Sequence, residues 1–79
     1  MATEIPVINM TATGLNIKTL MKANNLKVSD VQNALGFNTP QSIFKWLRGD
    51  TLPSIDNLVA LSYILNITVD RLIITTPAV

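Results

Sequence analysis

The sequence predicts an all-α domain of five short helices, with a short extended segment at each end. The chain has 79 residues, which is the size of a single domain. Hydrophobic residues make up 48% of it and charged residues 14%, a composition that favours a packed core over disorder. Between residues 14 and 73, apolar positions recur with helical spacing in five stretches separated by glycine, proline and asparagine signals.

The composition also excludes several classes of protein. The chain contains no cysteine and no histidine, which removes disulfides, the usual zinc ligands, thiol nucleophiles and imidazole bases. Its five acidic residues are scattered singly, which indicates no metal site. We therefore expect no enzyme activity, cofactor, metal or small-molecule ligand. No apolar run approaches the roughly 18 residues of a membrane span and no secretory signal is present, so we expect a cytoplasmic protein without a membrane partner.

The first segment, 1–13, is β-branched around Pro6 and is expected to form an arm or a short edge strand. A helix over 14–24 follows, with Thr13 as its expected N-cap. Its apolar face is formed by Leu15, Ile17, Leu20 and Met21.

The second helix is expected over 28–35, after the turn signal of Asn24 and Asn25. Ser29 and Asp30 are placed to cap its first turn. Its apolar stripe consists of Leu26, Val31, Ala34 and Leu35. Gly36 follows directly and predicts a helix stop, because glycine readily adopts the left-handed conformation there. A sharp turn at 36–38 is therefore expected.

The third helix is expected to run to about Arg48, capped by Asn38 or Thr39 and with Pro40 at its first position. At about 100° per residue, one face of this helix is apolar and the opposite face is polar and basic. The apolar face holds Ile43, Trp46 and Leu47, and the polar face holds Gln41, Lys45 and Arg48.

Residues 49–53 form a loop, and Ser54 is expected to cap a fourth helix that ends near Asn66. Thr68 is expected to cap a short fifth helix over 69–73, followed by an extended end at 73–77. The apolar stripe of the fourth helix comprises Ile55, Leu58, Val59, Leu61, Ser62 and Leu65.

The formal net charge of +1 hides an uneven distribution. Residues 14–48 hold five basic residues against Asp30 alone, a net charge of +4, whereas the remaining residues carry −3. The positive half includes the helix that is apolar on one side and polar on the other. The major groove of B-DNA admits one α-helix, and glutamine, lysine and serine side chains can hydrogen-bond to base edges there.

Three short motifs, in this order along the chain, are typical of one protein family. They are the Leu35-Gly36 turn, the Ile-x-x-Trp-x-x-Gly end of the third helix, and the Leu52-Pro53-Ser54 start of the fourth helix. With the stretches 26–36, 41–49 and 52–58 around them, the sequence resembles the Cro/repressor-type (XRE-like) helix-turn-helix DNA-binding domains over about residues 14–73. The resemblance implies a five-helix lambda-repressor-like fold, recognition of double-stranded DNA through the third helix, and binding as a dimer to a two-fold operator. It divides the chain into an arm (1–13), a helix-turn-helix domain (14–73) and a tail (74–79).

Two departures from the family pattern affect the expected contacts. The segment from Gly36 to Trp46 is one residue longer than usual, with Thr39-Pro40 near the turn, which leaves open which side chain meets which base. Val28 stands where members often carry a glutamine that touches the DNA backbone. A phosphate contact there has to come from Lys27, Ser29 or main-chain amides.

The expected DNA-binding residues lie on the third helix, on its turn and at the first turn of the second helix, together with one lysine of the first helix. They are Asn38, Thr39, Gln41, Ser42, Phe44, Lys45, Arg48, Lys27, Ser29 and Lys22. Several of these residues also have an interpretation that does not involve DNA. Gln41, Lys45 and Lys22 can be solvated surface, Arg48 can offset the helix C-terminal dipole, and Phe44 can pack on the second helix or touch a thymine methyl.

The expected function is transcriptional repression by promoter occlusion, and the alternative is a small helical protein-interaction module such as an antitoxin or an anti-repressor partner. The low overall charge favours the alternative, whereas the concentration of basic residues in one half and the presence of only four aromatic residues oppose it. The apolar ends, with Ile5, Val7 and Ile8 at one end and 72–74 at the other, are expected to pair as short strands or to pack between two copies in a homodimer.

Overall fold

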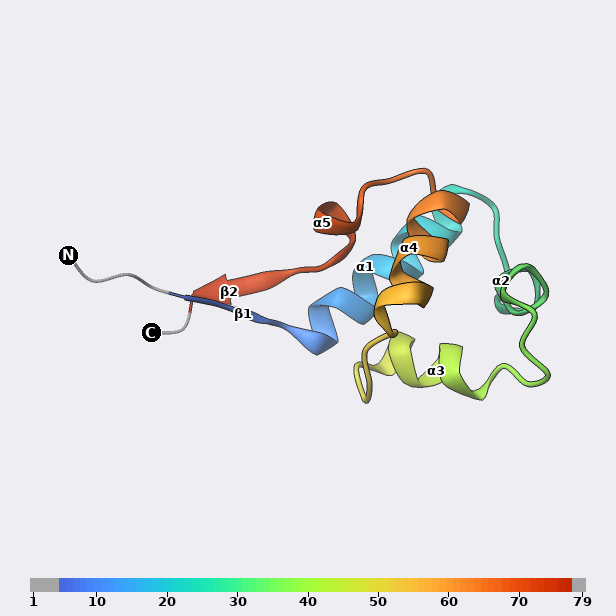
Figure 1. The fold of residues 1–79 in the computed structure, drawn as a ribbon, viewed down its shortest axis with the longest axis horizontal. Coiled ribbons are helices and arrows are strands. Elements are labelled where there is room, and N and C mark those ends of the chain that lie inside the picture. Colours follow the sequence, from blue (N-terminus) through green and yellow to red (C-terminus); the bar gives the residue numbers. More distant parts are fainter. Residues whose placement is uncertain (1–4, 78–79) are drawn as a thin grey trace.

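The computed structural model describes residues 5–77, in which five helices form one packed body and two short strands form a ribbon that extends from it (Figure 1). Residues 1–4 of the expected arm and 78–79 of the expected tail lie outside the described residues. The fold class is confirmed. In chain order the elements are β1 (Pro6–Ile8), α1 (Met10–Ala23), α2 (Val28–Leu35), α3 (Gln41–Arg48), α4 (Ile55–Ile64), α5 (Val69–Leu72) and β2 (Thr75–Pro77).

Helix α1 begins at Met10, earlier than predicted, and Thr13 is not its N-cap. The cap is Asn9, whose side-chain Oδ1 accepts a hydrogen bond of 2.9 Å from the amide of Ala12. Thr13 lies inside the helix and is buried. Its hydroxyl accepts a hydrogen bond from the amide of Ile74 at 3.0 Å, so it ties α1 to the C-terminal segment. The sequence pattern failed here because Asn and Thr are both good capping residues and Asn9 precedes an apolar Met10.

The core lies between α1, α3 and α4 and is closed by one side chain each from α2 and α5. Its buried members are Ile17, Met21, Val31, Ile43, Trp46, Leu61, Leu65 and Leu72. Leu15 was expected on the buried face of α1, but 62% of it is exposed. The inward position next to it belongs to Gly14, where the backbone of α3 takes the space that a side chain would need.

Helix α2 follows the prediction closely. The amide of Lys27 donates a hydrogen bond of 2.8 Å to Oδ2 of Asp30, which satisfies a free amide at the helix start. Gly36 ends the helix with a left-handed φ of 72°. The chain then closes back on α2 through Phe37, whose amide donates to the carbonyl of Gln32 at 3.0 Å.

Helix α3 begins at Gln41, and its N-cap position is occupied by Pro40 without any side-chain cap. The expectation that Asn38 or Thr39 caps this helix is therefore wrong, as is the placement of Pro40 at the first helical position. The carbonyl of Pro40 accepts the first helical hydrogen bond, from the amide of Phe44 at 3.1 Å. Residues 36–40 instead make a wider connection between α2 and α3.

Ser54 caps α4 as predicted, and its hydroxyl accepts a hydrogen bond from the amide of Asn57 at 3.3 Å. Asn66 ends this region with a left-handed φ of 54°. The predicted apolar stripe of α4 is only partly buried. Leu61 and Leu65 are in the core, whereas Ile55 and Val59 are 79% and 56% exposed, because α4 is covered on one side only.

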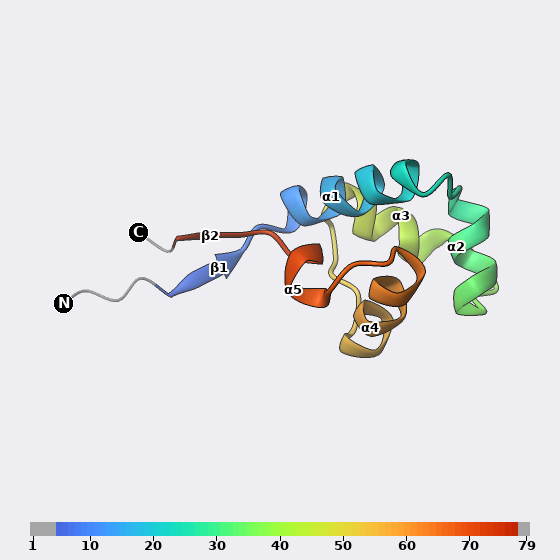
Figure 2. The ribbon, with the colours of Figure 1, turned by 90° about the horizontal axis from the view of Figure 1, so that it is seen from above.

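The two strands pair antiparallel, with Val7 opposite Thr76 and Ile8 opposite Thr75. The ends therefore pair within one chain, which is one of the two expected arrangements, but the second strand is 75–77 and not the expected 72–74, because Leu72 belongs to α5 and is buried in the core. The ribbon projects from the helical body on the side away from α2, and the described part of the molecule is 47 Å long and 21 to 23 Å across (Figures 1 and 2). None of the helices among residues 5–77 is long and apolar enough to cross a membrane.

Candidate nucleic-acid interface

The outward face of α3 gathers four of the predicted side chains around one hollow. Gln41, Phe44, Lys45 and Arg48 line this hollow, which has a volume of about 290 Å³. All four residues are exposed, and Phe44 is 43% exposed. They come from successive turns of the helix, so their outer ends form a continuous surface of an amide, an aromatic ring and two cations. We call these four residues the α3 face.

The opposite side of α3 holds the helix in place. Ile43 and Trp46 are buried, and the ring of Phe37 meets that of Trp46 edge-on with 5.8 Å between the ring centres. The carbonyl oxygen of Trp46 would lie 2.3 Å from a Cβ at Gly14, so α1 and α3 approach each other with their backbones. This packing fixes the direction of the α3 face, because α3 has no freedom to rotate without breaking the core.

Among residues 5–77, Arg48 is the one member of the α3 face that holds an ion pair. Its Nε donates to Oδ2 of Asp50 at 2.9 Å, and both side chains are more than half exposed. Asp50 therefore offsets part of the positive charge at the end of α3. An exposed pair of this kind contributes little to stability, so the two side chains can separate if an anion competes for the guanidinium.

A second group of cations lies where α1 meets α2. Lys18, Lys22 and Lys27 line a hollow of about 210 Å³, whose floor includes Leu47 of α3. Because Leu47 belongs to the helix that carries the α3 face, this hollow and its three lysines lie beside α3. We call them the flanking lysines. Lys18 was not among the predicted DNA-binding residues. Its spacing of four residues from Lys22 was the available signal, since such residues share a helix face.

The remaining four predicted residues are exposed but do not line either of the two hollows. Asn38 and Thr39 lie in the connection before α3, Ser29 lies in the first turn of α2, and Ser42 lies on α3 outside the hollow. None of the four lines either hollow. Their DNA contacts stay predictions.

The described residues contain no group of three or more acidic, cysteine or histidine side chains that could hold a metal ion. The chemistry offered by the surface is that of hydrogen-bond donors and cations arranged along a rigid helix. Such a surface suits recognition of an anionic partner by shape and hydrogen bonding.

Comparison with known proteins identifies a family match. The family model described as Helix-turn-helix (HTH_3) matches residues 17–72, which span from α1 to the end of α5. None of the curated proteins matches the sequence.

Several solved structures have the same fold. The restriction-modification controller protein C.AhdI from Aeromonas hydrophila has a TM-score of 0.71 and 21% identity, over 80% of this chain and 94% of that one. The P22 c2 repressor in complex with synthetic operator 9T has a TM-score of 0.69 and 28% identity, over 76% and 89% of the two chains. Apo-HppE has a TM-score of 0.73 and 17% identity, but only 36% of that chain is covered, so the fold also occurs within a larger protein.

Proposed function

The chain belongs to the XRE-type helix-turn-helix family (HTH_3), a family of DNA-binding transcription regulators, and from this premise we propose that it is a sequence-specific repressor. In the proposal α3 lies in the major groove of double-stranded DNA. The protein prevents transcription by covering a promoter.

The observation that carries the proposal is the division of α3 into a buried side and the α3 face. A helix that enters the major groove needs outward side chains that donate to and accept from base edges, on a backbone that does not move. Gln41 can form a pair of hydrogen bonds to adenine, Lys45 can reach guanine or a phosphate, and Phe44 can contact a thymine methyl.

The flanking lysines support different roles for the two groups of side chains, one in phosphate binding and one in base recognition. Phosphate contacts position a protein on the duplex, and base contacts give it sequence preference. We assign Lys18, Lys22 and Lys27 to phosphates on one edge of α3. The α3 face then reads the bases, with Arg48 exchanging Asp50 for a phosphate.

Repression is favoured over activation by the P22 c2 protein, which is 28% identical and is named a repressor in complex with an operator. The mechanism requires only occupancy of the promoter, since a bound domain excludes another protein from the same groove. We further propose that the chain acts as a homodimer on a two-fold operator, with one α3 in each half-site.

A second candidate function, a protein-interaction module, is favoured by one observation. Tyr63 is 88% exposed on α4, and exposed aromatic side chains are typical anchors of protein interfaces. The same side chain is compatible with a DNA-binding homodimer.

The test is selection of bound duplexes from a random DNA pool, followed by measurement of the affinity for the enriched sequence against salt concentration. We expect an approximately palindromic site and a steep loss of affinity with salt, because phosphate binding releases counterions. Folded protein that enriches no sequence and shows no salt-dependent binding contradicts the proposal and favours the protein-interaction module.

A further inference from the structure

The hollow between the flanking lysines has apolar walls and a cationic rim. It has a volume of about 210 Å³ and lies where α1, the turn after it, α2 and α3 meet. Of its wall residues, Met21 is buried, and Leu26, Val28 and Leu47 are half-buried. The rim consists of the three flanking lysines, and no acidic residue is among the described residues that line the hollow. An apolar recess edged by cations is complementary to a molecule that joins an apolar group to a negative charge.

The turn after α1 holds the hollow in shape. Asn25 adopts a left-handed φ of 57°, which reverses the chain at the end of the helix. The amide of Leu26 then donates to the carbonyl of Met21 at 2.8 Å, so Leu26 is folded back beside α1. Lys27 follows directly, and its amide is bound by the carboxylate of Asp30 at 2.8 Å. The hollow is therefore formed by backbone hydrogen bonds before any ligand arrives, as ligand sites usually are.

The positive charge at the rim is not neutralised by the chain itself. Lys18 and Lys22 are four residues apart on α1, so their ammonium groups repel each other on one helix face. None of the flanking lysines forms an ion pair within residues 5–77. Asp30, the one acidic residue of 14–48, has its carboxylate on the amide of Lys27. A bound anion would relieve this repulsion.

We propose that this hollow binds a small aromatic carboxylate, with the ring on the apolar walls and the carboxylate among the flanking lysines. The size fits, since a cavity of about 150 Å³ is enough for a benzene ring. The wall residue Met21 carries a thioether, and sulfur packs favourably against aromatic rings. A lysine ammonium can bind the carboxylate and is also attracted to the face of a ring, which an aliphatic acid lacks. The sequence analysis did not predict a small-molecule ligand, because the hollow depends on contact with Leu47, far along the chain.

Occupancy of this site has a consequence for DNA binding. The carboxylate would neutralise the same three lysines that we assign to DNA phosphates, so ligand and duplex compete for them. Competition rests on the proposed function, whereas binding of the carboxylate to the free protein does not. The coupling is reciprocal, so DNA should weaken binding of the carboxylate by the same factor.

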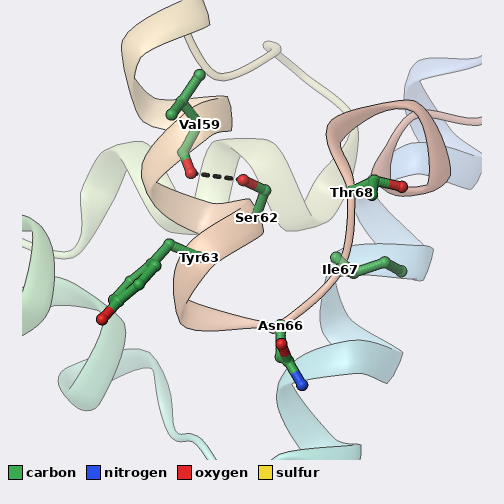
Figure 3. Close-up of a pocket in the computed structure, with 6 residues that line it drawn as sticks. All are labelled: Val59, Ser62, Tyr63, Asn66, Ile67 and Thr68. Carbon is green, nitrogen blue, oxygen red and sulfur yellow. Dashed lines mark hydrogen bonds between the residues drawn. The ribbon is translucent and has the colours of Figure 1, made fainter.

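The hollow beside α4 provides an internal reference. It has a volume of about 520 Å³ and is lined by Val59, Ser62, Tyr63, Asn66, Ile67 and Thr68, none of which is charged. Figure 3 shows the Tyr63 ring pointing away from Ile67 and Thr68, and the Ser62 hydroxyl donating to the carbonyl of Val59 at 2.6 Å. This larger hollow has no cation to hold a carboxylate, so it should not bind the same ligand.

The test titrates the full chain with benzoate in the absence of DNA and follows amide and methyl shifts by NMR. We expect saturable binding, with magnetisation transfer from the ring protons to the side chains of Met21, Leu26, Val28 and Leu47. Benzamide, which has the ring without the charge, should show no saturable binding at the concentrations that saturate benzoate. Acetate, which has the charge without the ring, should behave in the same way.

Lysine substitutions test the rim. The double variant Lys18→Gln, Lys22→Gln is expected to raise the dissociation constant of benzoate roughly tenfold, because two exposed charge interactions are lost. The matched control is Lys45→Gln, which removes a charge of the same kind from the α3 face outside this hollow. It should change the dissociation constant by less than about twofold, since distant exposed charges are screened. Circular dichroism checks that the variants are folded.

Four results would overturn the inference. They are the absence of saturable benzoate binding, equal binding of benzamide, ring contacts at the hollow beside α4, and an equal loss of affinity in Lys45→Gln and the double variant.

A second titration tests the competition. Benzoate at about ten times its own dissociation constant should raise the apparent dissociation constant for the selected duplex at least threefold, and full competition gives about tenfold. The reference is sodium acetate at the same concentration, which matches the ionic strength. An equal effect of acetate overturns the competition. A chain that binds benzoate but no DNA refutes the proposed function and leaves the ligand site standing, whereas a chain that binds DNA but no benzoate refutes the site alone.

Discussion

Individual side chains on and around α3 carry two separable tasks. Gln41 and Lys45 belong to the α3 face and are exposed over a core of Ile43 and Trp46, so they can be changed without disturbing the fold. Lys22 belongs to the flanking lysines, whose contribution is charge. Substitutions at the two groups are therefore expected to differ in how they change the affinity for a specific and for an unrelated duplex.

Gln41→Ala and Lys45→Ala are expected to weaken binding to the selected site by about 1 to 3 kcal/mol if they read bases. Their affinity for an unrelated duplex should change much less. Lys22→Ala is expected to lower affinity for both duplexes equally and to reduce the salt slope by about one. Fluorescence anisotropy with both duplexes at several salt concentrations checks this. Equal losses on both duplexes for Gln41→Ala would remove it from the residues that read bases.

The ion pair of Arg48 and Asp50 gives a second residue-level prediction. Asp50→Asn removes a negative charge next to the α3 face and frees the guanidinium, so affinity for every duplex is expected to rise about twofold to fivefold. Asp70→Asn, on α5, is the control for net charge. A rise of the same size in both variants would show a general charge effect, and a fall in Asp50→Asn would mean that Asp50 positions Arg48 for DNA.

At the scale of elements, the tightest constraint is the contact of α1 with α3. A Cβ at Gly14 would lie 2.3 Å from the carbonyl oxygen of Trp46 and 2.8 Å from that of Leu47. Backbone atoms cannot move aside as a flexible side chain does. The glycine therefore sets the distance between the helix that carries two of the flanking lysines and the helix that carries the α3 face.

Gly14→Ala is accordingly expected to lower the free energy of unfolding by about 1 to 3 kcal/mol, although alanine is the better helix former. Gly36→Ala is the comparison, because its φ is 72° but no atom lies near the added Cβ. It is expected to cost about 1 kcal/mol for the left-handed conformation alone. Urea unfolding of both variants measures the difference. A Gly14→Ala protein as stable as the wild type would contradict the close packing of α1 on α3.

Sequence periodicity predicted the five helices and the stops at Gly36 and Asn66 because these depend on neighbouring residues. It also predicted the core positions of Ile43 and Trp46 and the polar side of α3. It could not predict that Leu15, Ile55 and Val59 are exposed, since an apolar stripe has the same spacing whether its own chain covers it or not. The roles of Gly14 and Thr13 were equally invisible, because they depend on contacts with Trp46 and Ile74, far along the chain.

At the scale of the whole molecule, the charge separation seen in the sequence becomes a spatial one. The flanking lysines lie along α3, whereas α4 contains Asp56 alone among charged residues. The N-terminal and C-terminal segments are held together by the strand ribbon and by Thr13 and Asn16. The Asn16 side chain donates to the carbonyls of Arg71 and Leu72 at 3.0 and 2.9 Å. The result is one packed body in which the cations of the α3 face and the flanking lysines both belong to the helical part.

A dimer of such bodies makes a prediction about DNA geometry. Half-sites bound by a two-fold dimer are separated by whole helical turns, so inserting about five base pairs between them turns one half-site to the far side of the duplex. We expect this insertion to lower the affinity for the selected site to that of a single half-site. Insertion of a full helical turn, about ten base pairs, returns both half-sites to the same side of the duplex, so it should restore part of the lost affinity only if the dimer can stretch. Gel-shift titration measures both. Affinity that does not depend on spacing would contradict binding as a rigid dimer.

In the proposed complex the α3 face contacts the DNA. This contact is tested most directly by titrating the isotope-labelled chain with the selected duplex and following the backbone amide shifts by NMR. We expect the largest changes at residues 41–48 and smaller ones at 18–29, where the flanking lysines lie. Changes confined to α4, with none along α3, would show that α3 does not contact the DNA.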